Sequence, residues 1–200
     1  MLIAAYVYVR YYEHVAISTM TKRPRPLPPF ELCNIYYKYD PNSGLFIRRI
    51  DTGNGKYKKG DIAGGPHGKH GEQYWRIWVN SQGIRGNRLA WLLHYGKDPG
   101  PDFVVDHIDG NRLDNRIKNL RLATMAENNR NRKIGANNTS GFKGVYMTRL
   151  ENLPYCARIN VDGADKYLGA FKTKEEAAFA YEEASIEYHG EFKRVEALAT

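Results

Sequence analysis

The sequence predicts an α+β fold, and three features of its patterning support that class. Residues 34–100 alternate aromatic or β-branched side chains with polar ones around turn-like segments, as the strands of hairpins do. Residues 103–133 follow the order strand, polar loop, strand and helix. Residues 138–192 contain three short strand-like runs and then one helical run. We therefore expect a β-rich N-terminal region that includes a β-loop-β-α segment, followed by a three-stranded antiparallel sheet packed on one helix.

Composition narrows the classes of partner before any motif does. The chain has 200 residues, of which 42% are hydrophobic, so it can bury the core of one large or two small domains. Its formal net charge is +8. The basic excess falls in residues 1–100, which carry 15 basic and 7 acidic side chains. A polyanionic partner is expected, with nucleic acid the leading candidate and an anionic membrane surface second.

Residues 1–33 are interpreted as an N-terminal extension and a proline-rich linker. The opening apolar run stops at Arg10, which is too short to span a bilayer, and the basic start of a secretory signal is missing. The segment "TKRPRPLPPF" has four prolines in ten residues, which disfavours helix and central strand alike. Cys33 and Cys156 lack the spacing of a zinc site or disulfide framework, so we expect buried thiols in a reducing compartment. A cytoplasmic protein without a membrane partner is the expectation.

Residues 34–100 are expected to form two hairpins and a helix. The first hairpin turns at residues 40–44, and the second turns at residues 81–83. Between them, the glycine-rich residues 51–71 predict an irregular basic loop. The apolar run "RLAWLLHYG" predicts a short helix that ends at Gly96.

The polar segment that follows carries residues suited to phosphodiester chemistry. An apolar run leads into Asp106 and His107, a loop rich in asparagine and arginine follows, and "LRLAT" and "AENNRNRK" predict a second strand and a helix. Cleavage needs an activated water and charge neutralisation on the phosphoryl and leaving oxygens. A histidine can serve as the base, and Asp106 and Asn128 offer the hard oxygen ligands that magnesium or manganese prefers.

The segment "DHIDGNRLDNRIKNLRLATMAENNRN" resembles the HNH endonucleases, and in particular their homing-endonuclease branch in phages and mobile introns. The resemblance implies a ββα-metal (His-Me finger) fold around one divalent cation. It implies His107 as the general base, Asp106 and Asn128 as metal ligands, and Asn119 as a loop-fixing residue that helps to orient the base. Many relatives have histidine where Asn128 stands, and this H-N-N variant favours magnesium or manganese over zinc.

Basic side chains around this segment are candidates for phosphate contact, because guanidinium grips phosphate oxygens in a bidentate manner. Roughly half of them are expected to be ordinary solvated arginines. The candidates are Arg88, Arg112, Arg116, Arg121 and Arg130.

The C-terminal region is expected to present a basic and aromatic sheet face to DNA, since the helix that begins after Thr173 would cover the other face. The motifs "SGFKGVY", "YCARI", "YLGAF" and "EEAAFAYEEASIEYHGE" resemble the Apetala/ethylene-response-factor DNA-binding domain of plant transcription factors, which implies a sheet that lies in the major groove. The predicted contact residues are Lys143, Tyr146, Arg149, Arg158, Lys166 and Tyr167.

Together these features predict a site-specific DNA endonuclease of homing type, with a nuclease domain at residues 34–136 and a DNA-binding domain at residues 137–200. It would act as a monomer on double-stranded DNA with one magnesium or manganese ion, in the cytoplasm of a bacterial host cell if a phage encodes it. A non-enzymatic, sequence-specific DNA-binding regulator on an inactive nuclease scaffold is the alternative, and an RNA-directed nuclease is a weaker third hypothesis.

Overall fold

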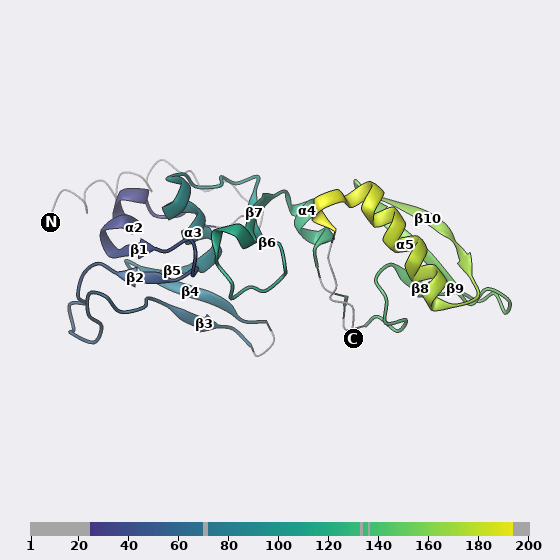
Figure 1. Cartoon of the computed structure of the whole chain (residues 1–200), viewed down its shortest axis with the longest axis horizontal. Helices are drawn as coiled ribbons and strands as arrows, with labels where there is room; N and C mark the ends of the chain where they lie inside the picture. Colours follow the sequence, from purple (N-terminus) through teal and green to yellow (C-terminus); the bar gives the residue numbers. More distant parts are fainter. Residues whose placement is uncertain (1–24, 70–71, 133, 136, 194–200) are drawn as a thin grey trace. The chain divides into compact units, whose positions relative to one another are not determined.

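The computed structural model describes residues 25–69, 72–132, 134, 135 and 137–193 (Figure 1). The interpretation of the first 24 residues therefore lies outside the described part of the chain. The described residues form two compact units. Unit 1 contains the residues up to Asp102 together with Arg112–Leu120, and unit 2 contains Phe103–Asn111 and the residues from Arg121 onwards. The boundary predicted between residues 136 and 137 stays a prediction.

Unit 1 begins with a helix that the sequence did not predict. Helix α2 (Phe30–Tyr36) directly follows Pro29, its N-cap residue, so the prolines of the predicted linker lie before the helix, where a helix can do without their backbone donors. Cys33, fully buried, holds the helix to the core, and burial raises the pKa of its thiol to about 12. Strands β1 (Tyr37–Tyr39) and β2 (Phe46–Arg48) then form the first predicted hairpin.

The second hairpin of unit 1 belongs to a three-stranded antiparallel sheet in the order β3-β4-β5. Strands β4 (Tyr74–Val79) and β5 (Gln82–Arg85) are joined at Asn80 and Ser81, whose φ angles of 44° and 64° are those of a two-residue hairpin turn, one residue before the predicted turn. Strand β3 (Gly65–His67) lies in the segment predicted to be irregular. Pro66 is tolerated there because β3 is an edge strand.

Helix α3 (Gly86–Tyr95) packs against α2, β1, β4 and β5 and closes the core of unit 1. It ends at Gly96 in the left-handed conformation, as the sequence predicts. The fully buried side chains around it are mainly aliphatic and aromatic and include Phe46, Ile77, Val79 and Leu89.

Unit 2 contains the first strand, most of the second strand and the helix of the predicted strand–loop–strand–helix segment, together with the C-terminal sheet, while most of the loop belongs to unit 1. Strands β6 (Val104–His107) and β7 (Leu120–Ala123) pair, and helix α4 (Met125–Arg130) follows directly. The connection between the strands includes the short helix η1 (Ile117–Asn119), which unit 1 holds through hydrogen bonds from Tyr39 Oη to Asn115 O (2.7 Å) and from Ile117 N to Pro41 O (3.1 Å).

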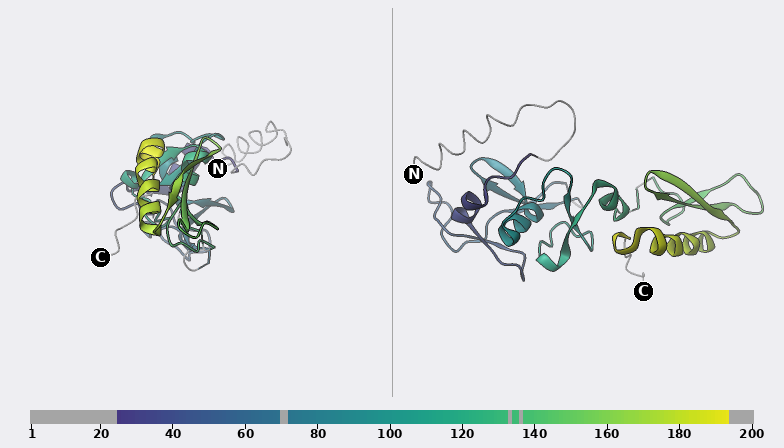
Figure 2. Two further views of the ribbon diagram at one scale, coloured as in Figure 1. Left: turned by 90° about the vertical axis from the view of Figure 1, so that its right-hand side faces the viewer. Right: turned by 90° about the horizontal axis from the view of Figure 1, so that it is seen from above.

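The C-terminal sheet has the predicted architecture. Strands β8 (Val145–Met147), β9 (Tyr155–Val161) and β10 (Ala164–Phe171) form an antiparallel sheet with β9 in the centre. Helix α5 (Lys174–His189) lies along one face of it (Figures 1 and 2), and the short helix η2 (Gly190–Phe192) follows. Val145, Ala157 and Ala177 form the buried centre of this packing. No helix in the described part of the chain is long and apolar enough to cross a membrane.

Candidate active site

The end of strand β6 brings together the acid and the histidine that the sequence singles out. Asp106 and His107 are each only 7% exposed. The strand stops at once, because Gly110 adopts a φ of 72° and its N–H donates to His107 O over 2.9 Å. Adjacent strand residues point to opposite faces, so an acid and a neighbouring histidine can serve one site only where the strand is ending, and β6 does end at His107.

Asp106 is held by an arginine of the neighbouring strand. Arg121 on β7 donates from Nε (3.1 Å) and Nη2 (3.0 Å) to Oδ2 of Asp106. The two side chains are only 12% and 8% exposed, so this is a buried ion pair. Arg121 also donates to the carbonyl of Glu191 and lies over the Phe192 ring, 4.2 Å from its centroid. The guanidinium therefore fixes the acid and ties the strand pair to the C-terminal end of the unit.

Helix α4 starts immediately after β7 because a reciprocal capping box of Thr124 and Glu127 closes its first turn. The Thr124 side chain accepts from Glu127 N, and the Glu127 carboxylate accepts from Thr124 N over 2.7 Å. The Thr124 backbone N–H and then its hydroxyl lower the pKa of Glu127. A six-residue helix has little intrinsic stability, so this capping box determines where α4 begins and which of its residues face the strands.

Asn131, at the end of α4, clips the helix to the end of β6. Its Nδ2 donates to Asp106 Oδ2 (3.0 Å), His107 O (2.8 Å) and Ile108 O (3.3 Å), and the residue is 4% exposed. One buried amide thus joins the acid, the backbone of the histidine and the helix. Asn131 is not among the site residues predicted from the sequence, although its spacing three residues after Asn128 was a usable signal.

Asn128 lies one helical turn before Asn131. Helix α4 packs against β6, and Asn128 lies in the third position before its C-cap residue Asn131. The backbone N–H of Asn128 donates to Thr124 O over 3.0 Å, and the residue is partly exposed. The predicted role of Asn128 as a metal ligand beside Asp106 stays a prediction.

Asn119 fixes part of the motif loop within unit 1. Its Nδ2 donates to Asp114 O over 3.0 Å, it is 7% exposed, and its backbone N–H donates to Arg116 O over 2.9 Å. This is the kind of contact that a loop-fixing residue makes. Its predicted influence on the orientation of the histidine stays a prediction.

The carboxylate of Asp106 is the oxygen donor on which the predicted metal site depends. The hydrogen bonds that the described residues make to this carboxylate come from Arg121 and Asn131 and all reach Oδ2. Carboxylate and amide oxygens are the donors that magnesium and manganese accept, and magnesium keeps several waters when one or two protein oxygens bind it. Among the described residues, no three His, Cys, Asp or Glu side chains gather as a metal cluster. The predicted pair of Asp106 and Asn128 would offer oxygen ligands to magnesium or manganese, and not the nitrogen and sulfur ligands that zinc prefers.

The arginines predicted to contact phosphate are mostly engaged with the protein itself. Arg88 donates to Arg25 O over 2.8 Å and pairs with Asp98 at 3.4 Å, and burial lowers its pKa. Arg116 pairs with Asp114, Arg130 pairs with Asp162 at 2.7 Å, and Arg121 pairs with Asp106. Arg112 is exposed and no ion pair is found for it among the described residues. Asp114 lies only two residues from Arg116, whereas the sequence could not show the other ion pairs because the fold brings their partners together.

The predicted DNA-binding face of the C-terminal sheet is smaller than expected. Ala157 lies in the core under α5, and Arg158, the next residue, therefore points to the open face together with its cross-strand partner Tyr167. Lys166 pairs with Ile159, so it lies on the helix side, where its Nζ donates to Tyr188 Oη over 2.8 Å. Placing Lys166 and Tyr167 on one face was wrong, because successive strand residues alternate.

The other predicted contact residues of this region also fall into two groups, those on or beside the open face and those away from it. Lys143 directs its ammonium to the carbonyl oxygens of Arg130 and Arg132, the second at 3.2 Å, and so does not lie on the open face. Tyr146, opposite Cys156 on the open face, is 54% exposed, and Arg149 is exposed in the turn after β8. The contact residues that remain available on or beside the open face are Tyr146, Arg149, Arg158 and Tyr167, and their role stays a prediction.

Comparison with known proteins identifies the class of this site. A family model described as HNH endonuclease matches residues 87–130, which include β6, β7 and all of α4. Protein 3.8 of Escherichia phage T7 is 35% identical over 105 residues, which are 52% of this chain and 84% of that protein. The uncharacterized HNH endonuclease L560 of Acanthamoeba polyphaga mimivirus is 38% identical over 101 residues, 50% of each chain. No solved structure matches the chain at a significant level.

The strand–loop–strand–helix segment with its buried acid and histidine is thus an HNH endonuclease domain. The HNH endonuclease domain covers residues 87–130, and one relative of the chain is named as an HNH endonuclease. The family match ends at residue 130, so the resemblance of residues 138–192 to the Apetala/ethylene-response-factor domain stays a prediction.

Proposed function

We propose that the protein is a site-specific DNA endonuclease of homing type that hydrolyses phosphodiester bonds with one magnesium or manganese ion. The observation that carries this proposal is the end of β6, where Asp106 and His107 lie buried side by side and Asn131 joins both to α4. If this segment were only a surface turn capped by Asp106, the carboxylate would not need a buried arginine and a buried amide to hold it in place.

In this proposal His107 accepts the proton of the attacking water. The backbone of His107 is held from both sides, since its carbonyl accepts from Gly110 N and from Asn131 Nδ2. A general base gains from such anchoring because its reach to the water must be kept within hydrogen-bond distance. Asp106 and Asn128 would hold the cation, which when bound would stabilise charge on the phosphoryl and leaving oxygens.

The open face of β8–β9–β10 would hold or select the DNA target. Arg158 and Tyr167 are cross-strand partners on this face, with the guanidinium 5.9 Å from the ring centroid, and both are exposed. The acidic first turn of α5 lies on the opposite side of the sheet. A local basic and aromatic face can bind DNA although residues 137–200 carry 8 basic and 10 acidic side chains.

The test is cleavage of DNA by the purified full-length chain with and without magnesium. His107→Ala should reduce cleavage by at least about a hundredfold, because general-base catalysis contributes roughly 10²–10⁴ in rate, and it should leave the DNA mobility shift intact. His94→Ala is the matched control, since His94 lies exposed on α3 outside the site, and it should cleave like the wild type.

Two results would overturn the proposal. Undiminished cutting by His107→Ala would remove the assigned base. A mobility shift by the wild type without any product, in magnesium and in manganese, would instead support the non-enzymatic DNA-binding regulator.

A further inference from the structure

Strand β4 presents an unusual outer face in unit 1. Ile77 and Val79 point into the core and are 0% and 1% exposed, so the alternate residues Tyr74, Arg76 and Trp78 point outward. Trp78 is 54% exposed, although a large aromatic ring on a strand is ordinarily covered. The outer face of this sheet therefore has aromatic and cationic side chains where a solvated sheet face usually has mixed charges.

Three arginines on or beside this face lie against aromatic rings. The guanidinium of Arg76 lies 4.5 Å from the Trp78 ring centroid, and that of Arg85 lies 5.0 Å from the Tyr74 centroid. Arg48 lies 4.5 Å from the Tyr57 centroid and 5.7 Å from that of Tyr37. An aromatic ring attracts a cation without cancelling its charge, so these arginines keep their ability to attract an anion.

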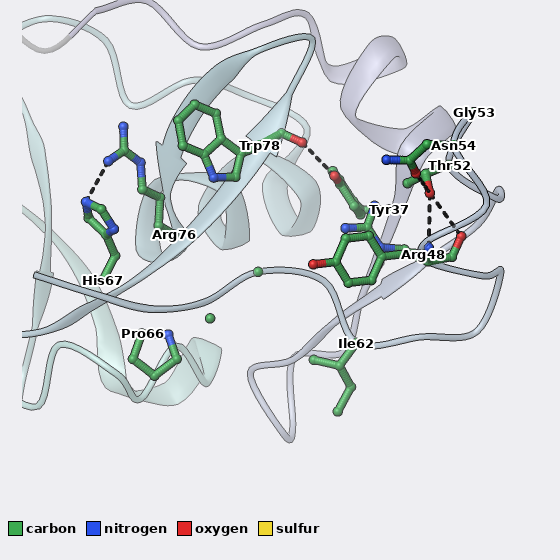
Figure 3. A pocket seen from close by; sticks show the side chains of 13 residues that line it. Tyr37, Arg48, Thr52, Gly53, Asn54, Ile62, Pro66, His67, Arg76 and Trp78 are labelled. Atoms are coloured by element: carbon green, nitrogen blue, oxygen red, sulfur yellow. Dashed lines mark hydrogen bonds between the residues drawn. The ribbon is translucent and has the colours of Figure 1, made fainter.

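A hollow of about 690 Å³ lies between Arg48 and Arg76 (Figure 3). This volume is within the roughly 300–1,000 Å³ of typical ligand sites. None of the described residues that line it carries a carboxylate. Nε of Arg48 is buried and makes no hydrogen bond to the described residues, while Nη1 of Arg76 donates to His67 Nε2 over 2.7 Å. The lining residues are Tyr37, Arg48, Thr52, Tyr57, His67, Arg76 and Trp78, together with smaller residues between them.

Gly83 leaves room for the Arg76 guanidinium beside the Trp78 ring. It is the cross-strand partner of Trp78 on β5 and has no side chain to cover the indole. A Cβ at this position would collide with the guanidinium of Arg76. The absence of a side chain at residue 83 therefore leaves room for the arginine beside the exposed ring.

We propose that this hollow, named here the β4 hollow, binds an unpaired nucleotide of the DNA substrate. One base would stack on Trp78, and the neighbouring phosphates would contact Arg48 and Arg76. In a duplex the faces of the bases are covered by stacking, so an exposed aromatic ring can stack only on an unpaired base, and arginines between such rings suit the adjoining backbone. The inference rests on the proposed function in taking DNA as the ligand.

The test uses the full-length protein with EDTA present, so that cleavage plays no part. The probes are a fluorescent oligothymidylate and a blunt DNA duplex of equal length, and binding is followed by anisotropy. Trp78→Ala should weaken binding of the single strand about tenfold, because stacking of one base on an aromatic side chain changes affinity by roughly five- to 150-fold. Arg76→Gln should weaken it as well and lower its salt dependence. Binding of the duplex should change by less than about twofold in both variants.

Matched controls separate this effect from a general loss of exposed groups. Tyr95 is also 54% exposed but lies on α3 outside the hollow, and Lys97 is exposed outside it, so Tyr95→Ala and Lys97→Gln should bind like the wild type. Quenching of tryptophan fluorescence by oligothymidylate should be largely lost in Trp78→Ala, although Trp75 and Trp91 remain.

The proposal is overturned if Trp78→Ala and Arg76→Gln bind oligothymidylate like the wild type, or if both lose duplex and single strand equally, which would indicate a duplex surface. Failure of the proposed function gives a different result, because it appears as absence of cleavage in magnesium whatever the binding data show.

Discussion

The arginines of the HNH segment and those of the β4 hollow differ in what they contact. In the HNH segment, Arg121 and Arg130 pair with carboxylates, and their side chains are only 12% and 17% exposed. Around the β4 hollow, Arg48 and Arg76 lie against aromatic rings, beside a tryptophan that is 54% exposed. The first group is neutralised by its partners, and the second keeps its net charge. A basic motif therefore does not by itself identify the surface that meets a polyanion.

A substitution at Arg121 is the strongest test of the difference between the two groups of arginines. Arg121→Met would leave Asp106 buried without its cation, and loss of one partner of a buried ion pair costs about 3–5 kcal/mol. Arg85→Met, on the exposed sheet face, should change the unfolding free energy by less than about 1 kcal/mol, because it removes only an exposed cation–π contact. Urea denaturation followed by circular dichroism measures both.

The double variant Asp106→Leu with Arg121→Met controls for loss of the charge pair itself. Replacing both partners with apolar residues should recover much of the lost stability, since no buried charge then lacks a partner. If the single Arg121→Met variant is as stable as the wild type, the ion pair of Arg121 with Asp106 does not stabilise the fold. The two groups of arginines would then not differ in their contribution to stability.

Asn128 in α4 and Asn131 at its C-cap offer a finer comparison, since they lie three residues apart. Asn131→Ala should destabilise the protein by about 1–3 kcal/mol, because buried oxygens of Asp106 and His107 lose a donor. Asn128→Ala removes no side-chain hydrogen bond found among the described residues and should cost less than about 0.5 kcal/mol, yet it should raise the magnesium concentration needed for cleavage.

Urea denaturation and a magnesium titration of cleavage distinguish the roles of these two residues. If Asn128→Ala has the wild-type magnesium requirement, Asn128 is not a ligand. If Asn131→Ala is fully stable, the clip between α4 and β6 contributes nothing measurable to the fold.

Elements with strong local signals were predictable from the sequence. Alternating strands, a glycine after α3 and a threonine–glutamate capping pair before α5 are local properties, and the structure contains all of them. The capping box of α4 could be predicted in the same way, since Thr124 and Glu127 have the same spacing, although it is not among the predictions made from the sequence.

Elements that depend on distant partners were not predictable. Strand β3 has the sequence Gly-Pro-His and exists only because its backbone pairs with β4. The partnership of Arg121 with Asp106 joins residues 15 apart and depends on how β6 lies beside β7. The residue types of the candidate site and their order could be read from the sequence. The residue that pairs with Asp106 could not, because the fold determines it.

The smallest expected effect is the difference in DNA binding between variants on the two faces of the C-terminal sheet. Arg158→Gln should leave stability within about 0.5 kcal/mol of the wild type but lower the slope of DNA affinity against salt by about one, as loss of one phosphate contact does. Lys166→Gln should leave that slope unchanged, because the ammonium of Lys166 contacts Tyr188 on the helix side. Fluorescence anisotropy over a salt series measures both variants.

Point variants are preferable here to deletion of residues 137–200, because Arg121 contacts Glu191 and Phe192 and a deletion would disturb the acid of the candidate active site as well. Equal slopes for Arg158→Gln and Lys166→Gln would mean that the open face makes no phosphate contact of its own. The basic charge available to DNA would then lie outside this sheet, with the β4 hollow as the first place to measure it.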